Sequence, residues 1–133
     1  MLLGLLFGLF MFNACKDDDD TGTQEPDYHA HIHSPAANSS IAAGETLNIE
    51  IDFEDHNGGT VHHINVRIFN KSTGTEIFNG PSTAHVHKGS PYTFEHQHAL
   101  TGVATGTYIL EAKVWGHDDG VAEVTESVEF TVN

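Results

Sequence analysis

Residues 45–53 read ETLNIEIDF, and this stretch decides the fold because apolar and polar side chains alternate along it. Its four apolar side chains would all face one way, as in a strand with one face buried and the other in solvent. The same period of two recurs in residues 61–70 and 107–115. From Tyr28 onward the chain lacks the 3.6-residue period of an amphipathic helix. The sequence therefore predicts an all-β domain.

Turn residues divide the rest of the chain into short stretches of this kind, spaced by about eight to twelve positions. The turns are Asn57-Gly58-Gly59, Ser72-Thr73-Gly74, Asn79-Gly80-Pro81 and Asp118-Asp119-Gly120. The seven strands expected are Tyr28–Ser34, Glu45–Phe53, Val61–Asn70, Thr75–Phe78, Pro91–His98, Thr107–Trp115 and Val121–Val132.

Seven short strands in one domain resemble an immunoglobulin-like or fibronectin III-like antiparallel β-sandwich. Gly106-Thr107-Tyr108 resembles the tyrosine corner of such domains, and Ala43-Gly44-Glu45-Thr46 resembles their turn into the second strand. The resemblance covers residues 28–133. It implies the fold alone, because this architecture carries many functions.

Composition narrows the possible partners. The chain has 133 residues, of which 19 are acidic and 5 are Lys or Arg, so its formal charge is −14. One domain fits this length, and the charge argues against electrostatic binding of nucleic acid or anionic lipid. A single cysteine excludes an intrachain disulfide and a multi-cysteine metal cluster.

The N-terminal segment is expected to be a targeting signal. Residues 2–12, LLGLLFGLFMF, are apolar but too short to span a bilayer, as in the core of a signal peptide. Ala14-Cys15 follows and resembles the lipobox of bacterial lipoproteins, although Phe12 and Asn13 depart from that pattern. The resemblance implies a lipid on Cys15, which would become the new N-terminus.

The next residues suggest where the protein is displayed. Lys16–Asp20, KDDDD, resembles the signal that exports Gram-negative lipoproteins to the outer face of the outer membrane. We therefore expect a signal peptide over 1–14, a lipidated cysteine and acidic flexible tether over 15–27, and a domain over 28–133. The domain would be held at the outer membrane and face the cell exterior.

Histidine is the unusual residue of this chain, with 11 copies. His29, His31 and His33 alternate along the first expected strand, and His-x-His recurs at His85-Val86-His87 and His96-Gln97-His98. Residues i and i+2 on a strand lie roughly 6.5–7 Å apart. Two imidazoles at that spacing can bind one metal ion at about 2.0–2.1 Å.

An immunoglobulin-like topology would bring most of these side chains to one end of the sandwich. There the start of the first strand meets the second-to-third, fourth-to-fifth and sixth-to-seventh loops. His56, Asp55, Asp118 and Asp119 would lie beside them, whereas His96 and His98 fall toward the other end. The predicted metal ligands are His29, His31, His33, His62, His63, His85, His87 and His117.

Imidazoles with occasional carboxylates suit Zn²⁺ or Cu²⁺. A Ca²⁺ site in the acidic loop Asp52–Gly58 is an alternative. A pH switch is another, because protonation of all 11 histidines would change the formal charge from −14 to −3, and free imidazoles titrate near about pH 6.5.

The sequence carries no motif that favours catalysis: it has no Gly-x-Ser-x-Gly, no phosphate loop and no His-Glu-x-x-His. We therefore predict a non-enzymatic surface lipoprotein that binds Zn or Cu for metal capture, delivery or metal-assisted contact. The alternative is a structural or adhesion module of an outer-membrane complex that binds a protein or glycan. Trp115 and Phe69 would then be the exposed aromatic candidates for a glycan.

Overall fold

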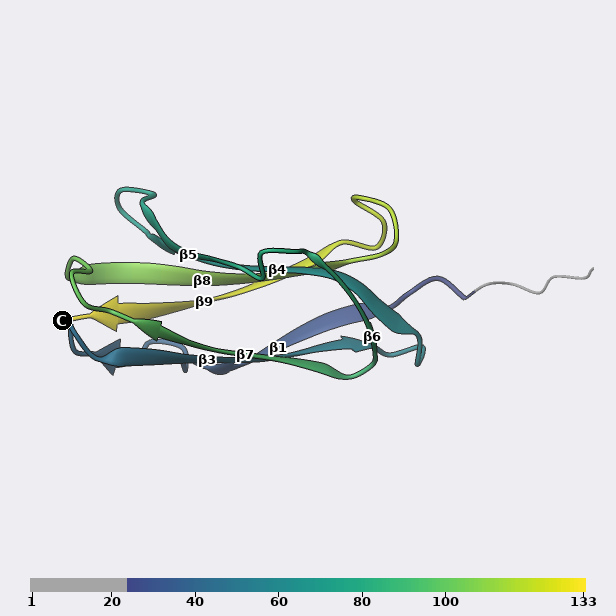
Figure 1. The fold of residues 1–133 in the computed structure, drawn as a ribbon, viewed down its shortest axis with the longest axis horizontal. Helices are drawn as coiled ribbons and strands as arrows, with labels where there is room; N and C mark the ends of the chain where they lie inside the picture. The colour runs from purple at the N-terminus through teal and green to yellow at the C-terminus, as the bar shows by residue number, and fades with distance from the viewer. Residues whose placement is uncertain (1–23) are drawn as a thin grey trace, which may run out of the picture.

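The computed structural model describes residues 24–133, which fold into two β-sheets packed face to face (Figure 1). One sheet has the strand order β1-β3-β7, and the other has the order β2-β9-β8-β4-β5 with β6 paired to the start of β4. Neighbouring strands are antiparallel except β2 and β9, which are parallel. The strands are β1 (Tyr28–Ser34), β2 (Ser40–Ile41), β3 (Thr46–Asp55), β4 (Thr60–Asn70), β5 (Glu76–Gly80), β6 (His85–Gly89), β7 (Tyr92–Ala99), β8 (Gly106–Trp115) and β9 (Val124–Val132).

The core lies between the sheets and consists of the alternating apolar residues that the sequence indicates. Every second side chain is buried along β3, along β4 from Ile64 onward and along β8 from Tyr108 onward, so the expected inner rows are confirmed. These rows are Leu47, Ile49, Ile51 and Phe53; Ile64, Val66 and Ile68; and Tyr108, Leu110, Ala112 and Val114. Burial of this apolar surface is the main force that holds the two sheets together.

Residues 24–133 contain nine strands where the sequence predicted seven, although the fold class is as expected. β2 has two residues and pairs in parallel, and β6 reads HVHKG, in which Val86 alone packs against the core. Neither strand carries an alternating apolar row, so neither could be found by periodicity. The last strand begins at Val124 and not at Val121, because Val121 closes a turn through backbone hydrogen bonds with Gly116 and Asp118.

The tyrosine corner expected at Tyr108 has the required hydrogen bond. The Tyr108 hydroxyl donates to the backbone carbonyl of Ala104 at 2.7 Å, while its ring is buried against Phe130. This bond ties the loop before β8 to the core.

We expect Tyr108→Phe to lower the free energy of unfolding by about 1–3 kcal/mol, because the Ala104 carbonyl loses its partner while the ring stays packed. Urea denaturation with an unchanged m-value would measure it. Thr107→Ser, a substitution on the neighbouring residue, is the control. A loss below about 0.5 kcal/mol for Tyr108→Phe would contradict this role of the hydroxyl.

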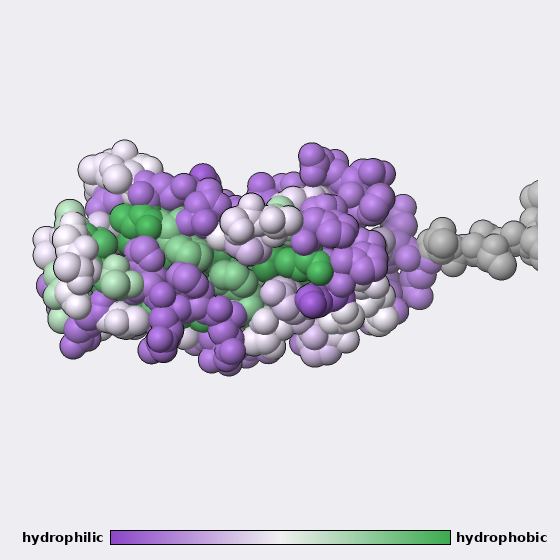
Figure 2. All heavy atoms as spheres, in the orientation of Figure 1, coloured by the Kyte–Doolittle hydropathy of each residue, from purple (hydrophilic) through white to green (hydrophobic). Residues whose placement is uncertain are grey.

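One end of the sandwich collects the segments that carry most of the histidines. The start of β1, the β3–β4 turn, β6 and the β8–β9 loop all lie at the end opposite the C-terminus (Figure 1). Hydrophilic residues cover this end, whereas hydrophobic side chains are visible in the band between the sheets (Figure 2). This much of the expected topology is confirmed.

The expected signal peptide, the expected lipidation site Cys15 and most of the expected tether lie outside the described residues. Within residues 24–133 there is no helix of the length and hydropathy needed to cross a membrane.

Candidate metal centre

The histidines of β1 point away from the core, as their alternation predicts. Tyr28 and Ala30 are buried, whereas His31 and His33 are exposed and His29 is half-buried. Because β1 and β3 are paired in one sheet, the outward side chains of β1 lie beside the outward side chains of β3, and His29 is paired with Glu54. Imidazoles and carboxylates therefore share the outer face of this sheet.

A buried carboxyl group shapes the end of this face. Asp55 is 6% exposed, and its Oδ1 accepts hydrogen bonds from the backbone N–H groups of Asp27 and Asn57, both at 3.0 Å. The His56 N–H in turn donates to the Asp27 carbonyl at 2.9 Å. Asp55 thus fixes the segment before β1 against the β3–β4 turn and brings Asp27 beside His56.

Gly59 must be a glycine because its backbone lies against the buried Asp55 carboxyl group. A side chain at Gly59 would collide with the Asp55 carboxyl group, and Gly58 has a positive φ of 74°. The sequence Asn57-Gly58-Gly59 therefore lets the turn fold closely over the buried Asp55.

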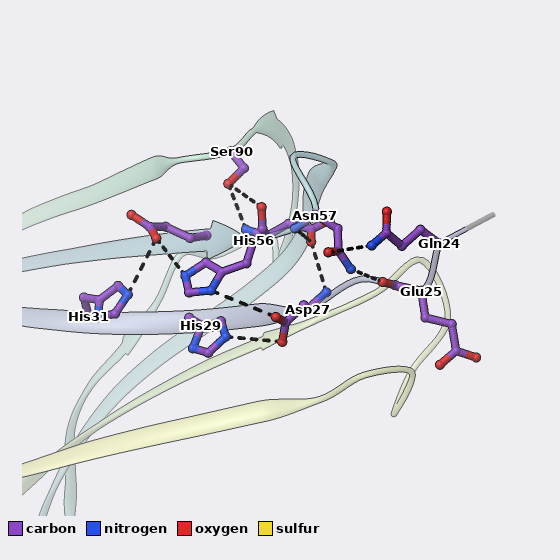
Figure 3. A network of polar contacts seen from close by, with 10 residues as sticks. Gln24, Glu25, Asp27, His29, His31, His56, Asn57 and Ser90 are labelled. Carbon is purple, nitrogen blue, oxygen red and sulfur yellow. Dashed lines mark hydrogen bonds and ion pairs between the residues drawn. The ribbon is translucent and has the colours of Figure 1, made fainter. Parts of the chain in front are cut away.

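Five side chains form what we term the carboxylate–histidine centre: Asp27, His29, His31, Glu54 and His56. Figure 3 labels its aspartate and its three histidines. Two groups of three within it each offer ligand atoms that lie within 4.8 Å of one another, namely Asp27, His29 and His56, and His31, Glu54 and His56. His56 belongs to both groups, through different nitrogens. Its Nε2 lies 3.2 Å from Glu54 Oε2, and its Nδ1 lies 4.0 Å from Asp27 Oδ2.

The separation of the histidine rings distinguishes the two groups. The His29 and His56 rings are stacked, with centroids 3.8 Å apart and planes inclined by 12°. An imidazole binds a metal in its own plane, so two closely stacked rings do not direct their lone pairs at one ion. The His31 and His56 planes are also nearly parallel, inclined by 18°, but their centroids are 6.4 Å apart, so the two rings do not lie face to face in contact, and both meet Glu54 Oε2, at 3.6 Å and 3.2 Å. The His31, Glu54 and His56 group is thus the better arranged to bind an ion.

His33, also a predicted ligand, lies apart from both groups. Its Nε2 donates to Asp52 Oδ2 at 2.9 Å, and Thr93 Oγ1 donates to the other carboxylate oxygen at 2.6 Å. These two contacts, the Thr93 hydrogen bond first, lower the pKa of Asp52 against the opposing effect of burial.

The remaining predicted ligands form a second group on the other sheet, which we term the imidazole cluster: His62, His63, His85, His87 and His117. Val61 and Ile64 are both fully buried although they are three residues apart, so His62 and His63 between them both lie away from the core. The pairing of β4 with β6 shifts register at this point, as at a β-bulge. Two adjacent histidines can share one side of the strand for this reason.

Contacts within the cluster are ring against ring. His62 meets His87 and His117 edge to face, with centroids 5.0 Å and 5.6 Å apart, and His63 meets His85 at 4.8 Å. Burial lowers the pKa of His62, and the four neighbouring histidines lower it further. His62 is therefore neutral near pH 7, the form that binds metals.

His96 and His98 lie with aromatic residues instead. Both rings pack on Phe78, with centroids 4.5 Å and 5.6 Å away. Burial lowers the pKa of His98, with a smaller contribution from His96. They contribute to packing between β5 and β7 and belong to neither group above.

The structure therefore divides seven of the eight predicted ligands between two places and leaves His33 with Asp52, outside both. His29 and His31 lie in the carboxylate–histidine centre, and His62, His63, His85, His87 and His117 lie in the imidazole cluster. The eight predicted ligands did not include Asp27, Glu54 or His56, although His56 was expected at the same end of the sandwich and Glu54 lies in the loop of the Ca²⁺ alternative. The signal for Glu54 is its position in the outward row of β3 opposite His29, whereas Asp27 was counted with the tether.

Two sheets packed in this way, closed by a tyrosine corner, define an immunoglobulin-like β-sandwich. Residues 29–112 match the family model described as the bacterial Ig domain, and the chain belongs to this family. Domains of this class are typically binding or structural modules.

Two solved structures of one archaeal domain agree on the fold. The solution NMR structure of the CARDB domain of a Pyrococcus furiosus protein is 18% identical, with a TM-score of 0.55 over 81% of this chain and 95% of that one. A crystal structure of that domain, in complex with di-metal ions, has a TM-score of 0.50 at 18% identity and covers 83% of this chain and 90% of that one. The fibronectin(III)-like modules of Clostridium thermocellum CbhA are 23% identical, with a TM-score of 0.48 over 79% of this chain and 46% of that one. Among curated proteins, none matches the chain.

Proposed function

We propose that this domain binds one divalent transition-metal ion, Zn²⁺ or Cu²⁺, through His31 Nε2, Glu54 Oε2 and His56 Nε2. The observation that carries the proposal is the convergence of three ligand atoms from β1, β3 and the β3–β4 turn on one point of the outer face.

The distances suit a metal of this kind. Two ligands about 2.0–2.1 Å from one ion lie about 3.3–3.4 Å apart at the tetrahedral angle. Glu54 Oε2 lies 3.2 Å from His56 Nε2 and 3.6 Å from His31 Nε2. Two imidazoles and one carboxylate form a ligand set that leaves a fourth position for water or for a group from a partner.

Asp27 orients the His56 ring and does not itself bind the ion in this proposal. It lies on the Nδ1 side of His56, at 4.0 Å, while Nε2 faces Glu54. A carboxylate beside the second ring nitrogen favours a proton on Nδ1 and leaves the lone pair on Nε2 for the ion. The stacked His29 ring holds the plane of His56.

The wider role follows from the expected anchor. A lipid on Cys15 would hold the domain at the outer membrane, facing the exterior, and the bound ion would serve metal capture, delivery or a metal-assisted contact with an outer-membrane protein. A CARDB domain of similar fold crystallised in complex with di-metal ions. This supports the proposal that a sandwich of this kind can bind metal. Binding of a glycan has less support, because Trp115 is stacked on His63 and Arg67 covers Phe69.

The test is calorimetric titration of the chelator-treated protein with Zn²⁺. We expect one saturable site that loses more than about 100-fold in affinity in His56→Gln and in Glu54→Gln, since each removes a direct ligand. Asp27→Asn should cost about 10–100-fold, as removal of an orienting carboxylate does. His33→Gln is the matched control. It removes a histidine that is as exposed as His56 and lies on β1, the strand that carries the ligand His31, and it should bind as the wild type does. Equal loss in His33→Gln and His56→Gln, or no saturable site, would contradict the proposal.

A further inference from the structure

A second pair of histidines, remote in sequence from the first centre, has the geometry of a metal site. His63 lies on β4 and His85 on β6, directly opposite each other in the strand pairing. His85 Nδ1 and His63 Nε2 are 3.1 Å apart. Neither residue belongs to the carboxylate–histidine centre.

The backbone fixes which nitrogen of His63 is available. His63 Nδ1 lies 2.7 Å from the carbonyl oxygen of Gly116. A carbonyl only accepts, so Nδ1 carries the proton and the lone pair is on Nε2, the atom that faces His85. A ring oriented through its far nitrogen by a backbone carbonyl is the usual arrangement of a metal-binding histidine.

The spacing of the two nitrogens sets the coordination angle. If both lie about 2.0–2.1 Å from one ion, their separation of 3.1 Å corresponds to about 95–102° at that ion. This lies between the right angle of tetragonal Cu²⁺ and the tetrahedral angle, and among first-row divalent ions Cu²⁺ has the highest affinity for such nitrogen ligands. The three-ligand groups found among residues 24–133 do not include this pair, so water would complete the shell.

We propose that His63 Nε2 and His85 Nδ1 bind a second ion, Cu²⁺, in the imidazole cluster. In the metal-free protein His85 Nδ1–H donates to His63 Nε2. On binding, the His85 proton moves to its Nε2, both lone pairs turn to the ion, and the protein releases no net proton. His62, His87 and His117 lie beside the site and are not ligands in this proposal.

The chain carries a reporter for this ion. Trp115 is its single tryptophan, and its ring stacks on His63 with centroids 5.2 Å apart and planes inclined by 11°. The indole N–H donates to Asp119 Oδ1 at 3.1 Å, which fixes the ring in place. Paramagnetic Cu²⁺ bound to His63 would quench the fluorescence of an indole this close, and diamagnetic Zn²⁺ would not.

The experiment is a titration of the purified, chelator-treated protein with Cu²⁺, read by tryptophan emission. We expect saturable quenching that is weakened by more than about tenfold in apparent affinity in His85→Gln, since loss of a ligand should cost more than loss of an orienting group. His85 is exposed, so this variant should fold. Circular dichroism and the emission spectrum without metal verify the fold.

Two controls separate this site from its surroundings and from the first centre. His117→Gln removes an exposed imidazole of the same cluster and should quench as the wild type does. His56→Gln disables the first centre and should leave the quenching intact, so the second site can hold even if the proposed function fails. Quenching that does not saturate, is unchanged in His85→Gln, or is lost equally in His117→Gln would overturn the second site.

Discussion

Replacing Asp55 by alanine is expected to lower the free energy of unfolding by about 3 kcal/mol and to weaken metal binding at the carboxylate–histidine centre by about 10–100-fold. The Asp55 carboxyl group is 6% exposed and accepts two backbone hydrogen bonds, from Asp27 and Asn57. Without it, both N–H groups lose their partner at partly buried positions, at about 1–3 kcal/mol each.

The affinity for metal should fall because the Asp27 carboxylate is no longer held beside His56. Asp55 binds no metal in our proposal, yet it holds Asp27 against the β3–β4 turn, and the Asp27 carbonyl accepts from the His56 N–H at 2.9 Å. When this link opens, the Asp27 carboxylate no longer lies behind the His56 ring. The affinity should then fall to the level of Asp27→Asn.

Asp55→Asn is the matched control, because its amide oxygen can still accept from both N–H groups. It should retain most of the stability and of the affinity. Urea denaturation and Zn²⁺ titration of the two variants measure the two effects. If Asp55→Ala binds Zn²⁺ as tightly as the wild type, the buried carboxyl group has no part in positioning the centre.

The fold was predictable because burial imposes a period of two on the chain. Leu47 to Phe53 on β3 shows the rule without exception, and one sheet face is buried over the whole stretch. Short strands that bury little escape the rule. β6 contributes one core side chain, Val86, and is held by its pairing with β4.

The end of the sandwich that carries the histidines was also predictable, but its division into two places was not. That division depends on the register of β4 and β6, where the irregular pairing puts His62 and His63 on one side. It also depends on backbone contacts such as Asp27 with Asp55, which link residues far apart in sequence. A single sequence records neither, so Asp27 was assigned to the tether and Glu54 to the acidic loop Asp52–Gly58.

Metal should stabilise the domain strongly at neutral pH and not at mildly acidic pH. An ion that binds the folded state alone adds about 2.7 kcal/mol to the free energy of unfolding at 100 times its dissociation constant. Each imidazole ligand must be neutral to bind, and free imidazoles titrate near about pH 6.5. With two imidazoles on the ion, affinity should fall roughly 100-fold per pH unit well below that value, and the stabilisation by metal should disappear by about pH 5.

The stability of the metal-free protein also depends on pH, and this dependence must be subtracted from that of the metal-bound protein. The pKa values of His62 and His98 are lowered in the folded state, chiefly by burial. The unfolded chain therefore binds more protons as pH falls below about 6.5, so the metal-free protein loses stability on acidification. This loss runs in the same direction as the loss of metal.

The comparison that isolates the metal is the shift in melting temperature between Zn²⁺ and chelator at each pH. We expect a rise of several degrees at pH 7.5, in proportion to the free energy added, and no rise at pH 5. His56→Gln should show no rise at either pH, while its own acid sensitivity persists because His62 and His98 are intact. A rise at pH 5 equal to that at pH 7.5 would contradict imidazole ligands and favour oxygen ligands alone, as in the Ca²⁺ alternative. The pH dependence of the shift therefore distinguishes a histidine centre from an acidic loop that binds cations through its charge.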